Sequence, residues 1–275
     1  MGYRSSMRLG FTLPFADLDG GPLRPSSWSD AGRTAERLGY SSVWAFDAVG
    51  RGFMLPDPLM ALAAVGAATE KVELGTGIMQ LPIRNVMEVA HRLFTLEVTV
   101  PGRILFGVGP GSTATDFAVF GGSYPDRFVT FDRQWDQLRQ LVAEGRLDDV
   151  NLHAWPQTLG RPTLMLAGWR GRWVQRAATE SAGWIASGAY ADDVQLADGL
   201  ERYRALGGER AVVTNVQAGE DLEPLIERVN HLANIGFDDV IVTDRAASVE
   251  RMATIAAETL STGAETISTK EPSDD

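Results

Sequence analysis

Residues 72–108 have the sequence VELGTGIMQLPIRNVMEVAHRLFTLEVTVPGRILFGV, and this stretch decides the fold. It begins with the short apolar run Val72–Ile78, continues with a helical pattern over Val86–Val98 and ends with a second apolar run, Ile104–Val108. Apolar runs of this length without polar alternation are typical of parallel strands that are buried on both faces. A helix between two such strands predicts a βαβ unit.

The same alternation continues toward both ends of the chain. Further strands are predicted at Leu9–Pro14, Ser42–Phe46, Thr163–Leu166, Trp184–Ile185, Ala211–Asn215 and Asp239–Val242. Further helices are predicted at Trp28–Leu38, Asp57–Ala68, Phe131–Ala143, Trp173–Glu180, Val194–Ala205, Leu222–Ile235 and Val249–Leu260. About eight strand–helix pairs predict an α/β fold of the (β/α)8 barrel type, as a single domain over residues 7–260. The tail, 261–275, is rich in Ser, Thr, Glu and Asp, and we expect it to be disordered.

Composition excludes several classes of function. The net charge of −11 argues against nucleic-acid binding, which needs clustered Lys and Arg. The absence of cysteine from the sequence excludes disulfides, thiolate metal sites and a Cys nucleophile. The three histidines, His91, His153 and His231, do not stand at metal-ligand spacing, so we expect no metal site. We find neither a run of about 18 apolar residues nor a signal peptide at Met1–Met7, and we expect a cytoplasmic protein without a membrane partner.

The loop after the fifth predicted strand is the strongest candidate for a binding site. It consists of Gly168, Trp169, Arg170, Gly171 and Arg172, and a helix follows directly. Glycines allow close approach of the backbone to a ligand, and arginines beside a helix N-terminus bind anions. We therefore predict that this loop holds a cofactor phosphate. The alternative is a tight turn with solvated arginines.

Other candidates follow the second, third and fourth strands, because barrel active sites lie at the C-terminal ends of strands. Asp47 could accept a hydrogen bond from a ring N–H or from substrate, or could instead cap the following loop. The remaining candidates for cofactor binding are Gly77, Met79, Gln80, Gly109 and Ser112. The loop that holds the last two offers backbone N–H groups and hydroxyls, but could equally be an ordinary flexible loop. No residue is assigned a catalytic role.

In their order and spacing, several of these segments match a known pattern. The matching segments are Leu74–Ile78, Leu81–Arg84, Glu88–Arg92, Thr95–Leu96, Gly102–Ile104, Phe106–Gly111, Asp116–Phe117, Phe120–Gly121, Arg127–Phe128, Ala177–Ala178 and Ala182–Trp184. With them the chain resembles the luciferase-like monooxygenase superfamily of flavin- and deazaflavin-dependent enzymes, from about Met7 to Leu260. The long insertion of the luciferases proper is absent, so the resemblance does not imply light emission.

The resemblance implies a barrel that carries FMN or coenzyme F420 in its mouth. It places the ring against the end of the third strand, with a non-proline cis peptide around Gln80–Leu81, and the phosphate near the loop after the fifth strand. It also implies a small organic substrate. Candidate partners are a second copy of the chain, as a homodimer, and a separate flavin reductase.

One position departs from the pattern. Many deazaflavin-dependent relatives have Asp-His after the second strand, whereas this chain has Asp47-Ala48. The missing histidine favours FMN over coenzyme F420 and leaves no evident general base. The sequence thus predicts a flavin-dependent oxidoreductase of the monooxygenase type. The alternatives are a non-catalytic flavin-binding protein on the same barrel and a flavin-free barrel enzyme that acts on a phosphorylated metabolite.

Overall fold

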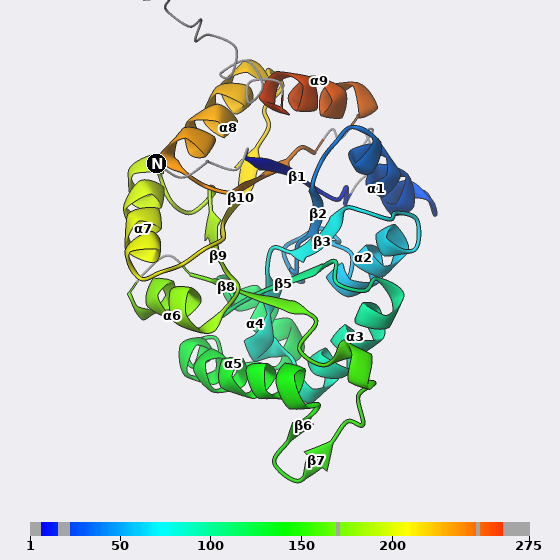
Figure 1. The fold of residues 1–275 in the computed structure, drawn as a ribbon, viewed down its shortest axis with the longest axis vertical. Helices are drawn as coiled ribbons and strands as arrows, with labels where there is room; N and C mark the ends of the chain where they lie inside the picture. Colours follow the sequence, from blue (N-terminus) through cyan, green and yellow to red (C-terminus); the bar gives the residue numbers. More distant parts are fainter. Residues whose placement is uncertain (1–6, 16–22, 169–170, 246–247, 261–275) are drawn as a thin grey trace, which may run out of the picture.

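The computed structural model describes residues 7–15, 23–168, 171–245 and 248–260, and in these ranges it forms a closed parallel barrel surrounded by helices (Figure 1). The strands of the barrel are β1 (Arg8–Thr12), β2 (Ser42–Ala45), β3 (Glu73–Thr76), β4 (Met79–Gln80), β5 (Ile104–Gly109), β8 (Thr163–Ala167), β9 (Gly183–Ser187), β10 (Ala211–Gln217) and β11 (Asp239–Thr243). Neighbouring strands pair in chain order, and β1 also pairs with β11, which closes the barrel. The predicted eight-stranded barrel is confirmed, since β3 and β4 occupy one strand position between them.

The third predicted strand is interrupted. β3 pairs with β5 at Leu74 and Gly75, and β4 resumes the pairing at Met79 and Gln80. Between them the peptide bond from Gly77 to Ile78 is cis. The expected position of this bond, around Gln80–Leu81, is therefore wrong by three residues, because pairing to β5 has already resumed where the cis bond was expected.

Helices cover the outside of the barrel (Figure 1). They are α1 (Ser27–Arg37), α2 (Pro58–Gly66), α3 (Val86–Thr99), α5 (Arg127–Glu144), α6 (Arg172–Glu180), α7 (Asp193–Ala205), α8 (Glu223–Ile235) and α9 (Val249–Leu260), whereas α4 (Ala114–Phe120) projects from one end of the barrel. Asp57 and Asn85 cap α2 and α3 by accepting backbone N–H groups through their side chains. A short hairpin, β6 (Arg146–Leu147) and β7 (Val150–Asn151), projects away from the barrel. Sequence patterns do not predict this hairpin, and they predict a loop where α4 forms.

Large side chains fill the interior of the barrel. Trp44 is fully buried there with Leu105, Met165 and Ile241. The ring of Trp44 lies so close to the neighbouring strand that a Cβ at Gly75 would be 2.3 Å from it. Only glycine fits at this position of β3, and the tryptophan seals the interior at mid-height.

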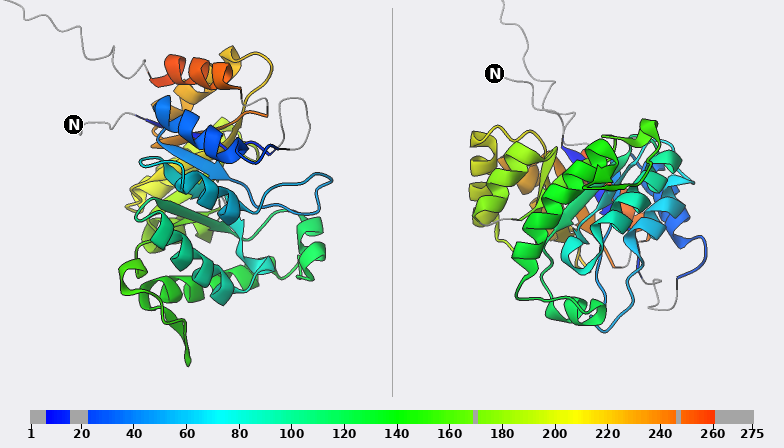
Figure 2. Two further views of the ribbon diagram at one scale, coloured as in Figure 1. Left: turned by 90° about the vertical axis from the view of Figure 1, so that its right-hand side faces the viewer. Right: turned by 90° about the horizontal axis from the view of Figure 1, so that it is seen from below.

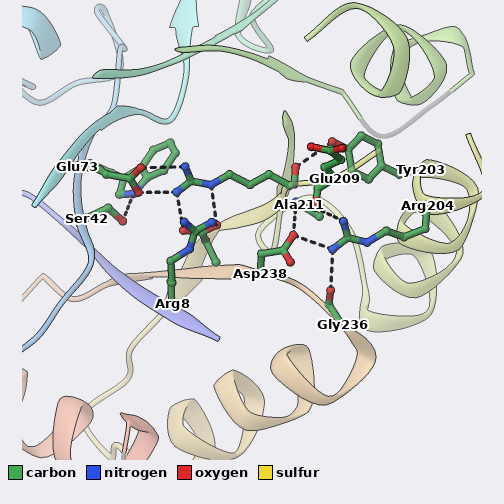
Figure 3. A network of polar contacts seen from close by, with 12 residues as sticks. Arg8, Ser42, Glu73, Tyr203, Arg204, Glu209, Ala211, Gly236 and Asp238 are labelled. Carbon is green, nitrogen blue, oxygen red and sulfur yellow. Dashed lines mark hydrogen bonds and ion pairs between the residues drawn. The ribbon is translucent and has the colours of Figure 1, made fainter. Parts of the chain in front are cut away.

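Ion pairs close the N-terminal end of the barrel (Figure 3). Arg210 at the start of β10 donates to both carboxylate oxygens of Glu73, at 3.0 and 2.6 Å, and to both of Asp239, at 3.0 and 2.9 Å. Arg8 donates to the same Asp239, whose side chain is fully buried. Burial lowers the pKa of Arg210, but hydrogen bonds and charges from Glu73 and Asp239 outweigh it, so the pKa is raised overall. The charges at this end of the barrel thus neutralise each other.

None of the helices in the described ranges combines the length and the apolar character that a membrane span requires.

Candidate active site

A cavity of about 540 Å³ opens at the C-terminal ends of the strands. Figure 2 shows α4 and the loop from β2 to α2 projecting from the same end of the barrel. Aromatic side chains form much of the wall, namely Phe15, Phe46, Phe53, Tyr124, Phe128, Trp173 and Tyr190. A mostly apolar pocket of this size at the C-terminal face of a barrel is the usual place for a cofactor and substrate.

Six of the predicted cofactor residues line this cavity: Asp47, Gly77, Gln80, Gly109, Ser112 and Gly168. Met79 does not, because successive side chains of a strand point to opposite faces. Its side chain is fully buried in the core between barrel and helices, whereas the next residue, Gln80, faces the cavity. The side chain of Met79 is therefore a core residue, contrary to the expectation that it faces a cofactor.

Three of the five predicted residues of the loop after β8 lie within the described ranges. Trp169 and Arg170 lie outside the described residues. Gly168 lines the cavity, but Gly171 and Arg172 are not among the residues of its wall. The Arg172 side chain is 56% exposed and pairs with Asp132 of α5 at 3.3 Å. Its guanidinium carbon lies 4.9 Å from the centroid of the Trp173 ring. Asp132 pairs with Arg176 as well and offsets part of the Arg172 charge, and the role of Arg172 in binding a phosphate stays a prediction.

Arg127, in the first turn of α5, is a cation of the cavity wall that the strand-end rule misses. Its guanidinium carbon lies 3.9 Å from the ring centroid of Tyr124 and 4.3 Å from that of Phe128. One Nη donates to the backbone oxygen of Tyr124 at 2.9 Å, while Nε is buried without a hydrogen-bond partner in the described ranges. Among the described residues, Arg127 has no carboxylate within ion-pair distance.

Two ion pairs with buried carboxylates form another part of the wall and its support. Arg84 donates to Asp47 at 2.5 Å, and Arg51 donates to Asp116 of α4 at 2.7 Å. Burial raises the pKa of Asp47, and the hydrogen bond and charge of Arg84 oppose that rise only in part. Gln80 connects the pairs, since its Nε2 donates to the backbone oxygen of Asp47 and to the carboxylate of Asp116. Asp47 therefore positions Gln80 and is engaged by the protein, rather than being a free acceptor.

A family model described as luciferase-like monooxygenase matches residues 7–212. The chain belongs to the luciferase-like monooxygenase family. This confirms the resemblance drawn from the sequence motifs, and the match covers all strands of the barrel except the end of β10 and β11.

The curated relatives of this luciferase-like chain are named either as monooxygenases or as F420-dependent dehydrogenases. Limonene 1,2-monooxygenase of Rhodococcus erythropolis is 31% identical over 39% of this chain and 28% of its own length. The F420-dependent glucose-6-phosphate dehydrogenase of Intrasporangium calvum is 35% identical over 39% of this chain and 33% of its own length. The alkanal monooxygenase alpha chain of Photorhabdus luminescens is 28% identical over 44% of this chain and 34% of its own length. The matches thus span about a third of each relative.

Solved structures share the fold of this luciferase-like barrel. The monooxygenase RslO1 of Streptomyces bottropensis has a TM-score of 0.76 at 18% identity, covering 94% of this chain and 99% of its own. An F420-dependent secondary alcohol dehydrogenase has a TM-score of 0.74 at 16% identity, covering 93% of this chain and 98% of its own. The relatives include several named F420-dependent, so the predicted preference for FMN has no support from them.

The luciferase-like barrel also turns polar groups into the cavity from β10. A register shift between Val213 and Val216 marks a bulge, in which Asn215 has a φ of 60°. Bulges re-aim side chains, and Thr214 and Asn215 both line the cavity. None of the three histidines is among the described residues of the wall. Neither the bulge nor Arg127 has a local sequence signal, although Arg127-Phe128 belongs to the family motifs.

Proposed function

We propose that this chain is an oxidoreductase that binds FMN or coenzyme F420 in the barrel mouth and acts on a small apolar organic molecule. The observation that carries the proposal is the polarity of the cavity. Its wall holds seven aromatic side chains, its described cations include Arg127 without a carboxylate partner, and its one described carboxylate, Asp47, is paired with Arg84. An excess of positive charge in the cavity of a protein with net charge −11 favours an anionic ligand.

The residues present fit such a cofactor. An anionic tail can pair with the charge of Arg127, beside Gly168 and the rings of Phe128 and Trp173, whose centroids are 6.5 Å apart. A planar ring can lie against the apolar and glycine surface of Gly77, Ile78 and Gly109. When bound, either cofactor supplies two-electron redox chemistry that the side chains of this protein cannot.

The protein itself binds, orients and excludes water. Trp44 and the ion pairs around Arg210 seal the barrel below the cavity, so the open side is the mouth. The aromatic wall favours an apolar substrate over a charged one. Relatives are named for limonene, alkanal and glucose 6-phosphate, and we infer that the aromatic wall of this chain suits molecules like the first two.

The test is titration of the purified protein with FMN and with coenzyme F420, each followed by fluorescence. We expect saturable binding of at least one of them. We also expect turnover, either of its reduced form with O2 and monoterpenes or aliphatic aldehydes, or of its oxidised form with secondary alcohols. Binding without turnover would favour a non-catalytic flavin-binding protein. Failure of both cofactors to bind would contradict the proposal and favour a flavin-free enzyme.

A homodimer and a separate flavin reductase remain part of the proposal. Gel filtration with light scattering would establish the first. The second predicts that reduced cofactor supplied by an unrelated reductase supports turnover.

A further inference from the structure

Strand β10 turns two consecutive polar side chains toward the cavity. Val213 and Val216 on either side are buried in the core between barrel and helices. Thr214 and Asn215 between them both line the cavity, because the register shift of the bulge lies there. Asn215 has a φ of 60°, in the left-handed region that asparagine tolerates better than most residues. Such departures from regular strand geometry often serve a binding site.

The side-chain amide of Asn215 is oriented by its neighbours. The hydroxyl of Thr214 donates to the backbone oxygen of Ala186 at 3.2 Å, so the hydroxyl oxygen is left as an acceptor. Asn215 Nδ2 donates to this oxygen at 3.4 Å and to Oγ of Ser187 at 3.3 Å. Both bonds are long, but the amide oxygen cannot replace the NH₂ group beside Thr214, because that hydroxyl has no proton left to donate. The amide therefore turns its oxygen, Oδ1, away from Thr214.

The amide oxygen of Asn215 is available to a ligand. No described residue donates to it, and it is not among the fully buried side-chain atoms that lack a partner. It therefore keeps accessible surface, and the open space beside Asn215 is the cavity. In this it differs from Gln80 Oε1, which is fully buried. An accessible acceptor without a protein partner selects a ligand that donates.

This acceptor adjoins the surface that we assign to the cofactor ring. Thr214 Cγ2 lies 3.4 Å from the position that a Cβ on Gly77 would take, and Phe46 Cε1 lies 3.7 Å from the same point. Ile185 of the neighbouring strand β9 also lines the cavity. A small molecule bound beside the ring thus meets one polar acceptor among apolar groups.

We propose that Asn215 Oδ1 accepts a hydrogen bond from a hydroxyl group of the substrate, and that the substrate is an apolar alcohol rather than a hydrocarbon, an ether or a ketone. This inference rests on the proposed function and names its substrate class. The aromatic wall takes the apolar body of the alcohol. An analogue without the donor is rejected, because it displaces solvent from the acceptor and returns no bond. Thr214 and Ser187 are positioning residues that act through Asn215.

The test compares α-terpineol, a tertiary alcohol, with its methyl ether, which lacks the donor. The protein is loaded with whichever oxidised cofactor binds, so that neither probe reacts, and binding is followed by the change in cofactor absorbance. We expect the alcohol to bind at least about fivefold more tightly, the lower end of the range for an acceptor left unpaired. A smaller ratio, or failure of both probes to bind, would overturn the inference and leave the cofactor proposal intact. Binding of neither FMN nor coenzyme F420 would overturn both.

Two variants assign the effect to Asn215. Asn215→Gly removes the acceptor, and glycine adopts the left-handed conformation without strain, so the preference for the alcohol should fall below about twofold. Gln217→Ala is the matched control, because Gln217 is another amide of β10 that lines the cavity, but it is exposed and solvated. It should keep the full preference. An equal preference in Asn215→Gly and wild type would overturn the assignment.

Circular dichroism checks that the variants fold. If Asn215→Gly does not fold, Thr214→Val takes its place. Without the oxygen of Thr214 the amide is free to turn its NH₂ group toward the cavity, so the preference for the alcohol should again fall. An unchanged preference in Thr214→Val would overturn the orientation on which the inference rests.

Discussion

The two ends of the barrel use arginine in opposite ways. At the N-terminal end, Arg210 makes four hydrogen bonds to Glu73 and Asp239, and Arg8 completes the network. At the C-terminal mouth, Arg127 lies between two aromatic rings without a carboxylate partner in the described ranges. A cation whose partners are all protein groups stabilises the fold. A cation held in place without an anion is available to a ligand.

The largest change in stability is expected from a substitution at the N-terminal end of the barrel, where the arginines have carboxylate partners. Asp239→Asn removes the buried charge that Arg8 and Arg210 share, and leaves Arg210 with Glu73 as its remaining carboxylate partner. We expect a loss of about 3–5 kcal/mol in the free energy of unfolding, measured by urea denaturation. Cofactor affinity of the folded protein should not change.

Asp198→Asn is the control for that substitution, because Asp198 pairs with Arg202 on the surface and is 63% exposed. It should cost less than about 0.5 kcal/mol. Similar costs for the two variants would remove the distinction between a buried network and a surface pair.

The next prediction concerns the C-terminal mouth, where Arg127 has no carboxylate partner in the described ranges. Arg127→Met keeps much of the apolar stem between the rings and removes the charge. We expect cofactor binding to weaken about 10- to 100-fold, as for a hydrogen-bonded ion pair, with little change in stability. Arg172→Met is the control and should weaken binding less than about threefold, since its charge is already paired with Asp132. A larger loss of affinity in Arg172→Met than in Arg127→Met would assign phosphate binding to the loop after β8.

This pair of arginines shows how far sequence reasoning extends. The strands are predicted well because a buried parallel strand is a local run of apolar residues, and the helices because their period is local. The loop 168–172 has the local features of an anion site, but the neutralisation of Arg172 by Asp132 depends on how α5 packs on α6. Likewise, Met79 and Gln80 are adjacent candidates, and only the observed pleat decides that Gln80 faces the cavity.

A third prediction concerns a saturated network between α5 and the C-terminal end of α6, away from the cavity wall. Glu180 accepts from Arg176 and Trp135. Burial raises the pKa of Glu180, but these bonds and the nearby cations outweigh it and lower the pKa below its usual 4.5. A lowered pKa contributes stability above the unfolded-state pKa and loses it as pH falls through the folded-state pKa.

Glu180→Gln should therefore cost about 1 kcal/mol at neutral pH, and this difference from wild type should shrink as pH falls from about 5 to about 3. Urea denaturation across this range measures it. A cost that is independent of pH would show that the charge of Glu180 contributes nothing.

The smallest effect is expected at Ser112. Its hydroxyl lies 3.4 Å from those of Thr113 and Tyr190, at the exposed rim of the cavity, so both contacts are weak. If Ser112 contacts the cofactor, Ser112→Ala should weaken binding about two- to fivefold, as for one neutral hydrogen bond. Unchanged affinity would assign the hydroxyl to the loop alone.

The tryptophan at mid-height of the barrel has a kinetic consequence. Trp44 and the charged network lie behind the cavity, which among the described residues opens at the C-terminal ends of the strands. A molecule bound in the depth of the cavity must arrive before any molecule that occupies the exposed rim near Tyr190, and must leave after it. Two ligands that share the cavity should therefore bind and dissociate in a fixed order. Initial-rate and product-inhibition kinetics test this order.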